Sequence, residues 1–227
     1  RCRQGGTLGN CKRLVILGAG GFARELRWLV EEMNSIEKRF EFVGYVVTDP
    51  SKLGEHDSRN EVRGDLDWMR EARGTVDAAA IGIGTPAARA LVATLTREAC
   101  PWLEWPALVH PSARFDSSPC TLGGGVVVCA GNVATVNVRF EPFSLVNLSC
   151  TLGHESVIGE FSVLNPTVNI SGGVTIGERV LVGTGAQVLQ YLSVGPGATV
   201  GAGAVVTKDV PAGATVVGIP AKPLTRT

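Results

Sequence analysis

The sequence predicts two parts of different architecture: a small parallel α/β sheet over residues 12–110 and a coil of short parallel strands over residues 111–207. Two observations carry this prediction. Strand and helix signals alternate in the first part, whereas in the second an apolar residue recurs at every sixth position for fifteen consecutive repeats. At 44% apolar composition the chance of such a run is on the order of 10⁻⁵.

The first part alternates short apolar segments with amphipathic ones. Residues 13–17 (RLVIL) predict a strand, residues 18–21 (GAGG) a turn, and the following residues a helix that extends to about residue 34. Further elements are predicted at residues 40–47 (strand), 65–72 (helix), 76–83 (strand), 86–99 (helix) and 108–109 (strand). This alternation is typical of a small Rossmann-like parallel sheet with helices packed on it.

The second part repeats with a period of six. The recurring apolar residues, each expected to fill the interior of a triangular coil, are Leu122, Val128, Ala134, Phe140, Val146, Leu152, Ile158, Leu164, Ile170, Ile176, Val182, Val188, Val194, Val200 and Val206. The residue four positions later is small or β-branched, as a tight corner requires, with Asn132 and Leu192 as departures. Because eighteen residues make one three-sided turn, we expect about five turns of a parallel β-helix, each rising about 4.8 Å. The sheet would cover one end of this coil and the tail, residues 208–227, the other.

The composition disfavours several classes of partner. The 227 residues carry 21 basic and 21 acidic side chains, so no net field attracts nucleic acid or an anionic membrane. No apolar run approaches the roughly 18 residues of a membrane span, and the polar opening lacks a secretory signal. The six cysteines show no metal-binding spacing. We therefore expect a cytoplasmic protein with free thiols and no metal site.

One of the three histidines falls on an outward position of the coil. His154 lies two positions after Leu152, Glu155 follows it directly, and Asn147 precedes it by seven residues. An imidazole can accept a proton near neutral pH, and a neighbouring carboxylate can orient the ring. His154 is therefore either a general base or a solvated surface histidine.

A pair of glycines is expected to lie close to this histidine. Gly172 follows His154 by one full turn of eighteen residues, so it should stack directly above it. With Gly173 it leaves backbone amides open to a developing oxyanion. The alternative is that both are ordinary turn glycines.

The glycine-rich turn after the first strand is a candidate phosphate site. Gly18, Gly20 and Gly21 stand between a predicted strand and a predicted helix, where the helix amides can bind a phosphate. The alternative is a turn that packs the helix closely on the sheet. A dinucleotide-dependent dehydrogenase would place an acid at the end of the second strand, but two uncharged residues stand there before Asp49, which disfavours NAD.

The coil, together with residues 203–211 (GAVVTKDVP) and 218–223 (GIPAKP), resembles the hexapeptide-repeat acyltransferases. Residues 14–25 (LVILGAGGFARE) narrow the resemblance to the family of sialic-acid O-acetyltransferases and nucleotide-amino-sugar N-acetyltransferases. It covers nearly the whole chain from about residue 12, and residues 1–11 are treated as an extension. The resemblance implies a left-handed β-helix, a homotrimer, and acetyl-CoA as the acyl donor.

The resemblance also implies roles for the residues named above. His154 corresponds to the general base, Glu155 to its acidic neighbour, and the Gly172 amide to the donor that meets the thioester carbonyl. The residues implied to contact the nucleotide sugar are Gly18, Gly20, Gly21, Asp49, Gly84, Thr85, Arg89 and Asn147. Those implied to contact CoA are Gly172, Gly173, Gly185, Ala186, Ala202, Ala204, Lys208 and Lys222. The two lysines are equally well explained as solvated tail charges.

Two departures from the family pattern leave the acceptor open. Many members carry a second histidine nine residues after the first, where this chain has Val163, and many close the second strand with consecutive aspartates, where it has Val47 and Thr48. The leading expectation is an N-acetyltransferase acting on the amino group of a nucleotide-linked sugar. The alternatives are O-acetylation of a sialic acid or another sugar hydroxyl, and a non-catalytic nucleotide-binding scaffold. A zinc-dependent β-helix carbonic anhydrase would need three histidines in the coil, which holds only His154.

Overall fold

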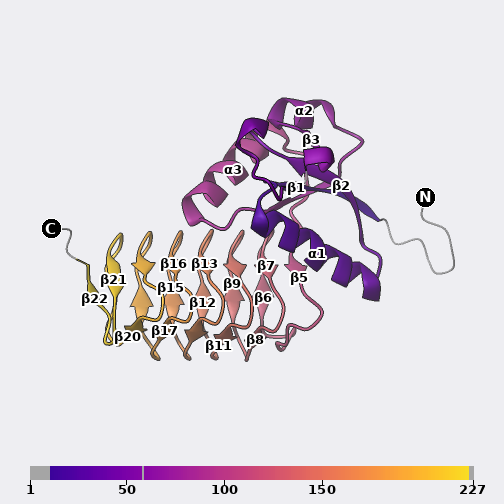
Figure 1. The fold of residues 1–227 in the computed structure, drawn as a ribbon. Helices are drawn as coiled ribbons and strands as arrows, with labels where there is room; N and C mark the ends of the chain where they lie inside the picture. The colour runs from indigo at the N-terminus through magenta and orange to yellow at the C-terminus, as the bar shows by residue number, and fades with distance from the viewer. Residues whose placement is uncertain (1–10, 58, 225–227) are drawn as a thin grey trace.

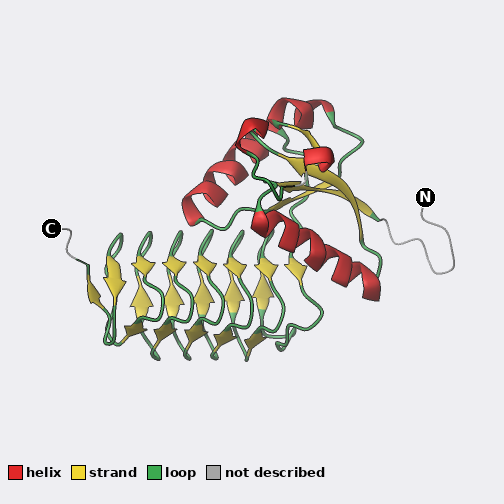
Figure 2. Cartoon of the chain, viewed as in Figure 1, coloured by secondary structure: helices red, strands yellow, loops and turns green. Residues whose placement is uncertain are grey.

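The computed structural model describes residues 11–57 and 59–224 and confirms the two-part architecture. Figure 1 shows the N-terminal part above one end of a long prism of short strands. Figure 2 shows that the helices of the described chain belong to the N-terminal part. Of the predicted extension, residues 1–10 lie outside the described residues.

The N-terminal part is a four-stranded parallel sheet in the order β3-β2-β1-β4, with helices on both faces. Its elements are β1 (Lys12–Leu17), α1 (Gly21–Ile36), β2 (Phe40–Val46), 3₁₀ turns at Pro50–Lys52 and Arg59–Glu61, β3 (Val62–Gly64), α2 (Leu66–Glu71), β4 (Ala78–Ile81) and α3 (Pro86–Ala99). Along β1, Leu14 and Ile16 pack toward α1, whereas Val15 and Leu17 pack toward α2 and α3. The sequence pattern does not predict β3, because its three residues carry little apolar signal.

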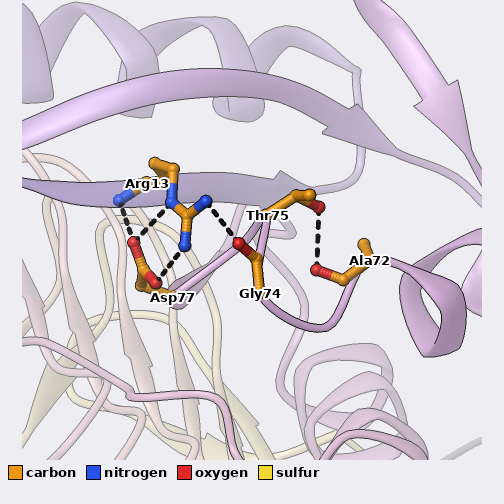
Figure 3. A network of polar contacts seen from close by, with 5 residues as sticks. All are labelled: Arg13, Ala72, Gly74, Thr75 and Asp77. Carbon is orange, nitrogen blue, oxygen red and sulfur yellow. Dashed lines mark hydrogen bonds and ion pairs between the residues drawn. The ribbon is translucent and has the colours of Figure 1, made fainter.

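An ion pair fixes the start of β1 against the segment that leads into β4. Figure 3 shows the guanidinium of Arg13 on the carboxylate of Asp77, with Nε donating at 2.8 Å and Nη2 at 2.7 Å. The Arg13 backbone amide donates to the same carboxylate at 2.9 Å, and Nη1 donates to the Gly74 carbonyl at 2.6 Å. These hydrogen bonds from Arg13 lower the pKa of Asp77 to about 2.

The C-terminal part is a left-handed parallel β-helix whose strands form three sheets. The eight-stranded sheet contains β5 (Leu108–Val109), β7 (Val127–Val128), β10 (Leu145–Val146), β13 (Val163–Leu164), β16 (Leu181–Val182), β19 (Thr199–Val200), β21 (Thr215–Val217) and β22 (Lys222–Pro223). The β11 sheet contains β8 (Val133–Ala134), β11 (Thr151–Leu152), β14 (Asn169–Ile170), β17 (Gln187–Val188) and β20 (Val205–Val206). The β12 sheet contains β6 (Thr121–Leu122), β9 (Arg139–Phe140), β12 (Val157–Ile158), β15 (Thr175–Ile176) and β18 (Ser193–Val194).

The structure corrects both ends of the predicted coil. Strand β5, expected to close the N-terminal sheet, pairs with β7 and begins the prism instead. The tail does not leave the coil at residue 208, because β21 adds a parallel strand to β19. Only β22 folds back, antiparallel to β21, at the end of the eight-stranded sheet. Chain that returns over an open sheet end protects its unpaired backbone groups.

The interior of the prism follows the six-residue repeat with one exception. Fourteen of the fifteen predicted interior residues are at most 5% exposed, but Leu122 is 36% exposed, because β6 is an end strand of its sheet. Asn132, one of the two departures at the corner position, is buried and satisfied. Its amide Nδ2 donates to the Cys129 carbonyl at 2.7 Å, and its Oδ1 accepts from the Cys150 amide at 2.9 Å.

From residue 125 to residue 203, the corners contain a residue in the left-handed backbone region at six-residue intervals. Six of these fourteen residues are glycines. The others are Asn137, Phe143, Ser149, Glu155, Phe161, Thr167, Arg179 and Tyr191. For bulky side chains this conformation is unfavourable, so the coil geometry imposes it.

The N-terminal part covers the outer face of the eight-stranded sheet. Val127, Leu145 and Val163 form an outward apolar row that is at most 1% exposed and packs into one core with α1 and β1. The next residue of the row, Leu181, is only partly buried, and the row continues with polar Thr199. Val163, at the position where the resemblance implies a second histidine, is therefore an interdomain packing residue.

Candidate functional site

His154 lies on a corner of the prism, at the turn between β11 and β12. We call the stack of turns that join the β11 sheet to the β12 sheet the His154 corner. The His154 side chain is 50% exposed, and its Nδ1 lies 3.4 Å from Glu155 Oε2. In the tautomer that carries its proton on Nδ1, the ring would donate to this carboxylate and present Nε2 as an acceptor.

Gly172 lies one turn above His154, as the spacing predicts. A Cβ built on Gly172 would lie 2.4 Å from His154 Nε2, so the imidazole occupies the space of the missing side chain. The backbone φ of Gly172 is outside the left-handed region, unlike that of Gly173 at 66°. The ring, and not the backbone conformation, therefore excludes a larger residue at position 172.

Backbone hydrogen bonds hold this corner in register. The Gly173 amide donates to the His154 carbonyl at 2.7 Å, and the Tyr191 amide donates to the Gly172 carbonyl at 3.0 Å. Within the described chain, the Gly172 amide donates no backbone hydrogen bond. A Cβ on Gly153 would lie 2.4 Å from that nitrogen, so Gly153 also keeps the space beside it open. An amide donor and an imidazole thus stand side by side at the surface.

The residues predicted to contact CoA are not all available to a ligand. Gly185, Ala202, Lys208 and Lys222 lie at least partly at the surface. Ala186 and Ala204 are fully buried, and their amides donate within the same corner to the carbonyls of Gly183 at 3.1 Å and Gly201 at 3.2 Å. The prediction of a direct contact is corrected for these two alanines, because they fill the interior of the coil.

The predicted CoA and acceptor residues are also divided between corners. Gly185, Ala202 and Asn147 follow strands of the eight-stranded sheet, so they lie on the corner that leads into the β11 sheet. Asn147 Oδ1 accepts from the Leu148 amide at 2.8 Å. Lys208 belongs to the His154 corner, eighteen residues beyond position 190. Within one chain the structure does not bring Asn147 next to His154.

A cavity of about 300 Å³ lies at the carboxyl ends of β1 and β2, in the N-terminal part. Its lining residues are Leu17, Gly18, Ala19, Gly20, Val46, Val47, Thr48, Asp49, Leu53, Asp57, Leu66, Ile83, Val92, Leu95 and Thr96. Three of the predicted nucleotide contacts, Gly18, Gly20 and Asp49, are among them. The other predicted glycines and threonine do not line the cavity, although Gly21 follows the lining residue Gly20, and Gly84 and Thr85 follow the lining residue Ile83.

The cavity combines an apolar wall with an open helix start. Gly20 is the N-cap residue of α1, and the first turn of the helix holds no acidic side chain, so its amides can bind an anion. Gly18 has φ of 101°, a conformation that favours glycine. The Asp49 carboxylate accepts from the Ser51 amide at 3.0 Å and the Ser51 hydroxyl at 2.6 Å. Asp57 was outside the predicted set, since its polar loop carries no recognisable motif.

The structure corrects the role predicted for Arg89. The side chain is fully buried, so it has no surface open to a substrate. Its Nη1 donates to the carbonyls of Ile81 at 3.0 Å and Ile83 at 2.8 Å, and its Nη2 donates to the Phe143 carbonyl at 2.9 Å. Burial lowers the pKa of Arg89 to about 10. Arg89 therefore joins the edge of this cavity in the N-terminal part to a turn of the prism.

Among the described residues, no group of three or more histidine, cysteine, aspartate or glutamate side chains is placed to hold a metal ion. None of the described helices is long and apolar enough to cross a membrane. A second cavity of about 160 Å³, not predicted from the sequence, lies between α1 and the prism beside Trp28 and His110.

A prism of this kind, with an exposed imidazole against a glycine, is the architecture expected of a hexapeptide-repeat acyltransferase. Solved structures agree. Perosamine N-acetyltransferase from Caulobacter crescentus, in complex with CoA and GDP-perosamine, matches with a TM-score of 0.82 and 26% identity over 97% of this chain and 99% of that one. The acetyltransferase domain of PglB from Neisseria gonorrhoeae, in complex with acetyl coenzyme A, matches with a TM-score of 0.80 and 29% identity over 94% and 99%.

A third match is WeeI from Acinetobacter baumannii, with a TM-score of 0.79 and 27% identity over 93% of this chain and 99% of that one. No protein-family model and no curated protein matches the sequence. The chain is an acyltransferase, and its matches among solved structures are sugar N-acetyltransferases of the hexapeptide-repeat family.

Proposed function

We propose that this protein transfers the acetyl group of acetyl-CoA to the amino group of a nucleotide-linked sugar. The observation that carries the proposal is the contact between His154 and Gly172, because glycine is required there only to leave room for an imidazole. The complexes of two similar enzymes with CoA and GDP-perosamine, and with acetyl coenzyme A, support the choice of substrates.

The chemistry follows from this pair. His154 Nε2 removes a proton from the sugar amine as the nitrogen attacks the thioester carbonyl, and Glu155 orients the ring through Nδ1. The Gly172 amide donates to the oxyanion that develops on that carbonyl. The carbon–sulfur bond then breaks, the new carbon–nitrogen bond remains, and the proton held by His154 passes to the leaving thiolate of CoA.

The nucleotide would occupy the cavity of the N-terminal part. The α1 amides behind Gly20 would hold the diphosphate, while the apolar wall would face the base and Asp49 the ribose. The N-terminal part covers the eight-stranded sheet, whereas the His154 corner is the edge of the prism opposite that sheet. We therefore propose a homotrimer, in which the sugar reaches the His154 corner of a neighbouring copy.

Thiol release from acetyl-CoA tests the proposal directly. A panel of nucleotide sugars that differ only in carrying an amine or a hydroxyl should give release with the amine. Faster release with the hydroxyl would replace the proposed reaction by O-acetylation. Nucleotide binding by calorimetry with no binding of acetyl-CoA would contradict the enzymatic proposal and indicate a scaffold.

A further inference from the structure

Tyr191 is an exposed aromatic residue on the His154 corner. It lies one turn above Gly173 and two turns above Glu155, and its side chain is 71% exposed. A Cβ built on Gly173 would lie 2.4 Å from Tyr191 Cδ1, so the ring covers Gly173, the residue next to Gly172. The Tyr191 amide donates to the Gly172 carbonyl. The ring is thus held directly beyond the proposed oxyanion donor.

Neither the backbone nor the solvent favours an aromatic residue at this position. Tyr191 has φ of 59°, where a bulky side chain is strained, and glycine stands at the same corner position at residues 173, 185, 197 and 203. Its exposed ring also leaves apolar surface in water. A ligand that covers the ring would offset the second cost, and the side chain would then serve a function that glycine does not.

The spacing along the corner identifies the ligand. Lys208 follows β20, the third strand beyond β11 in its sheet, so it lies about three turns, or roughly 14 Å, beyond His154 along the prism. The pantetheine arm of CoA, about a dozen bonds between sulfur and the first phosphate, spans roughly 15 Å when extended. A thioester held at His154 and Gly172 would therefore send its arm past Tyr191 and its diphosphate toward Lys208.

We propose that the Tyr191 ring forms a wall of the channel that holds the pantetheine arm of acetyl-CoA. This proposal rests on the proposed function. The ring supplies apolar contact to the arm's methylene and dimethyl groups, and its position over Gly173 keeps the arm in line with the Gly172 amide. Tyr191 thereby contributes to affinity for the acyl donor and takes no part in proton transfer.

A pair of glycine variants tests this role. Tyr191→Gly removes the ring and relieves the strained φ, so it should not lower the unfolding temperature, and the same holds for the control variant that follows. Arg179→Gly is the matched control, because Arg179 is exposed, has φ of 54°, and donates its amide to the turn below at 2.8 Å, but lies on another corner. Tyr191→Gly should raise the KM for acetyl-CoA by about 5- to 30-fold, the value expected for one lost aromatic contact. The change in kcat should be smaller, and Tyr191→Phe should recover most of the lost affinity.

Three results would overturn the proposal. The first is an unchanged KM for acetyl-CoA in Tyr191→Gly, and the second is an equal rise of this KM in Arg179→Gly. The third is a lower molecular mass of Tyr191→Gly by light scattering, which would make the ring a contact between copies. Calorimetric titration with CoA separates this failure from failure of the proposed function. If the wild type binds CoA but acetylates no sugar, the ratio of CoA dissociation constants between wild type and Tyr191→Gly still decides the role of Tyr191.

Discussion

The imidazole of His154 takes the space that a side chain at Gly172 would need, at 2.4 Å from the position of the absent Cβ. Alanine at residue 172 must therefore displace the ring. We expect Gly172→Ala to lower kcat by about 10- to 100-fold, because a displacement near 1 Å can cost that much. Ala130 and Thr184 hold side chains at the same turn position, so the unfolding temperature should not change. Full activity of Gly172→Ala in a steady-state assay would contradict the assigned geometry.

His154→Ala should lower kcat by about 10²- to 10⁴-fold, the usual contribution of a general base. His56→Ala is a suitable control, since His56 is also exposed but lies in the N-terminal part. Glu155→Gln should have a smaller effect, because the 3.4 Å separation makes its contact with Nδ1 weak. Turnover by His154→Ala near that of the wild type would exclude its role as the base.

Arg89→Met should destabilise the fold by about 3 kcal/mol, because it leaves buried carbonyls of Ile81, Ile83 and Phe143 without their donor. Urea unfolding measures this change. Arg139→Met, at an exposed arginine of the prism, should change the free energy of unfolding by less than about 0.5 kcal/mol. Equal stability of the two variants would show that the Arg89 contacts contribute little.

The ion pair between Arg13 and Asp77 predicts part of the acid sensitivity. The folded pKa of Asp77, about 2, lies below its ordinary value of 3.8, so its contribution is present above pH 4 and is lost as the pH falls toward 2. Asp77→Asn should lower the free energy of unfolding at pH 7 and flatten its decline between pH 4 and pH 2. Parallel acid-unfolding curves for the variant and wild type would refute this.

Burial raises the pKa of Cys129 to about 12 and that of Cys150 to about 11. Because the thiolate is the reactive form, both residues should resist iodoacetamide at pH 8 in the folded protein and react in guanidinium chloride. Mass spectrometry of the peptides measures the labelling. Rapid labelling of Cys129 in the native state would show that the interdomain core opens, and rapid labelling of Cys150 would show that the interior of the prism opens.

The regular features of the chain could be read from its sequence, and the irregular ones could not. The repeat predicted the interior of the prism and the stacking of Gly172 on His154, since a fixed period determines both. Strand β5 was assigned to the wrong sheet, because two apolar residues carry no information about their partner. Arg89 was expected at the substrate, because a sequence motif does not show that a guanidinium turns inward to backbone carbonyls. Whether Asn147 and His154 act together depends on neighbouring copies, which the sequence of one copy does not reveal.

The repeat of the prism limits how many residues can be deleted from the coil. A deletion of six residues between Glu155 and Gly172 would leave each remaining apolar residue inside and each strand paired. It would nevertheless carry Gly172, Tyr191 and Lys208 around to the next edge of the triangle, away from the imidazole. Such a protein would fold and yet be inert. A deletion that preserves folding thus needs to remove only a multiple of six residues, whereas one that preserves chemistry at this edge must remove a multiple of eighteen.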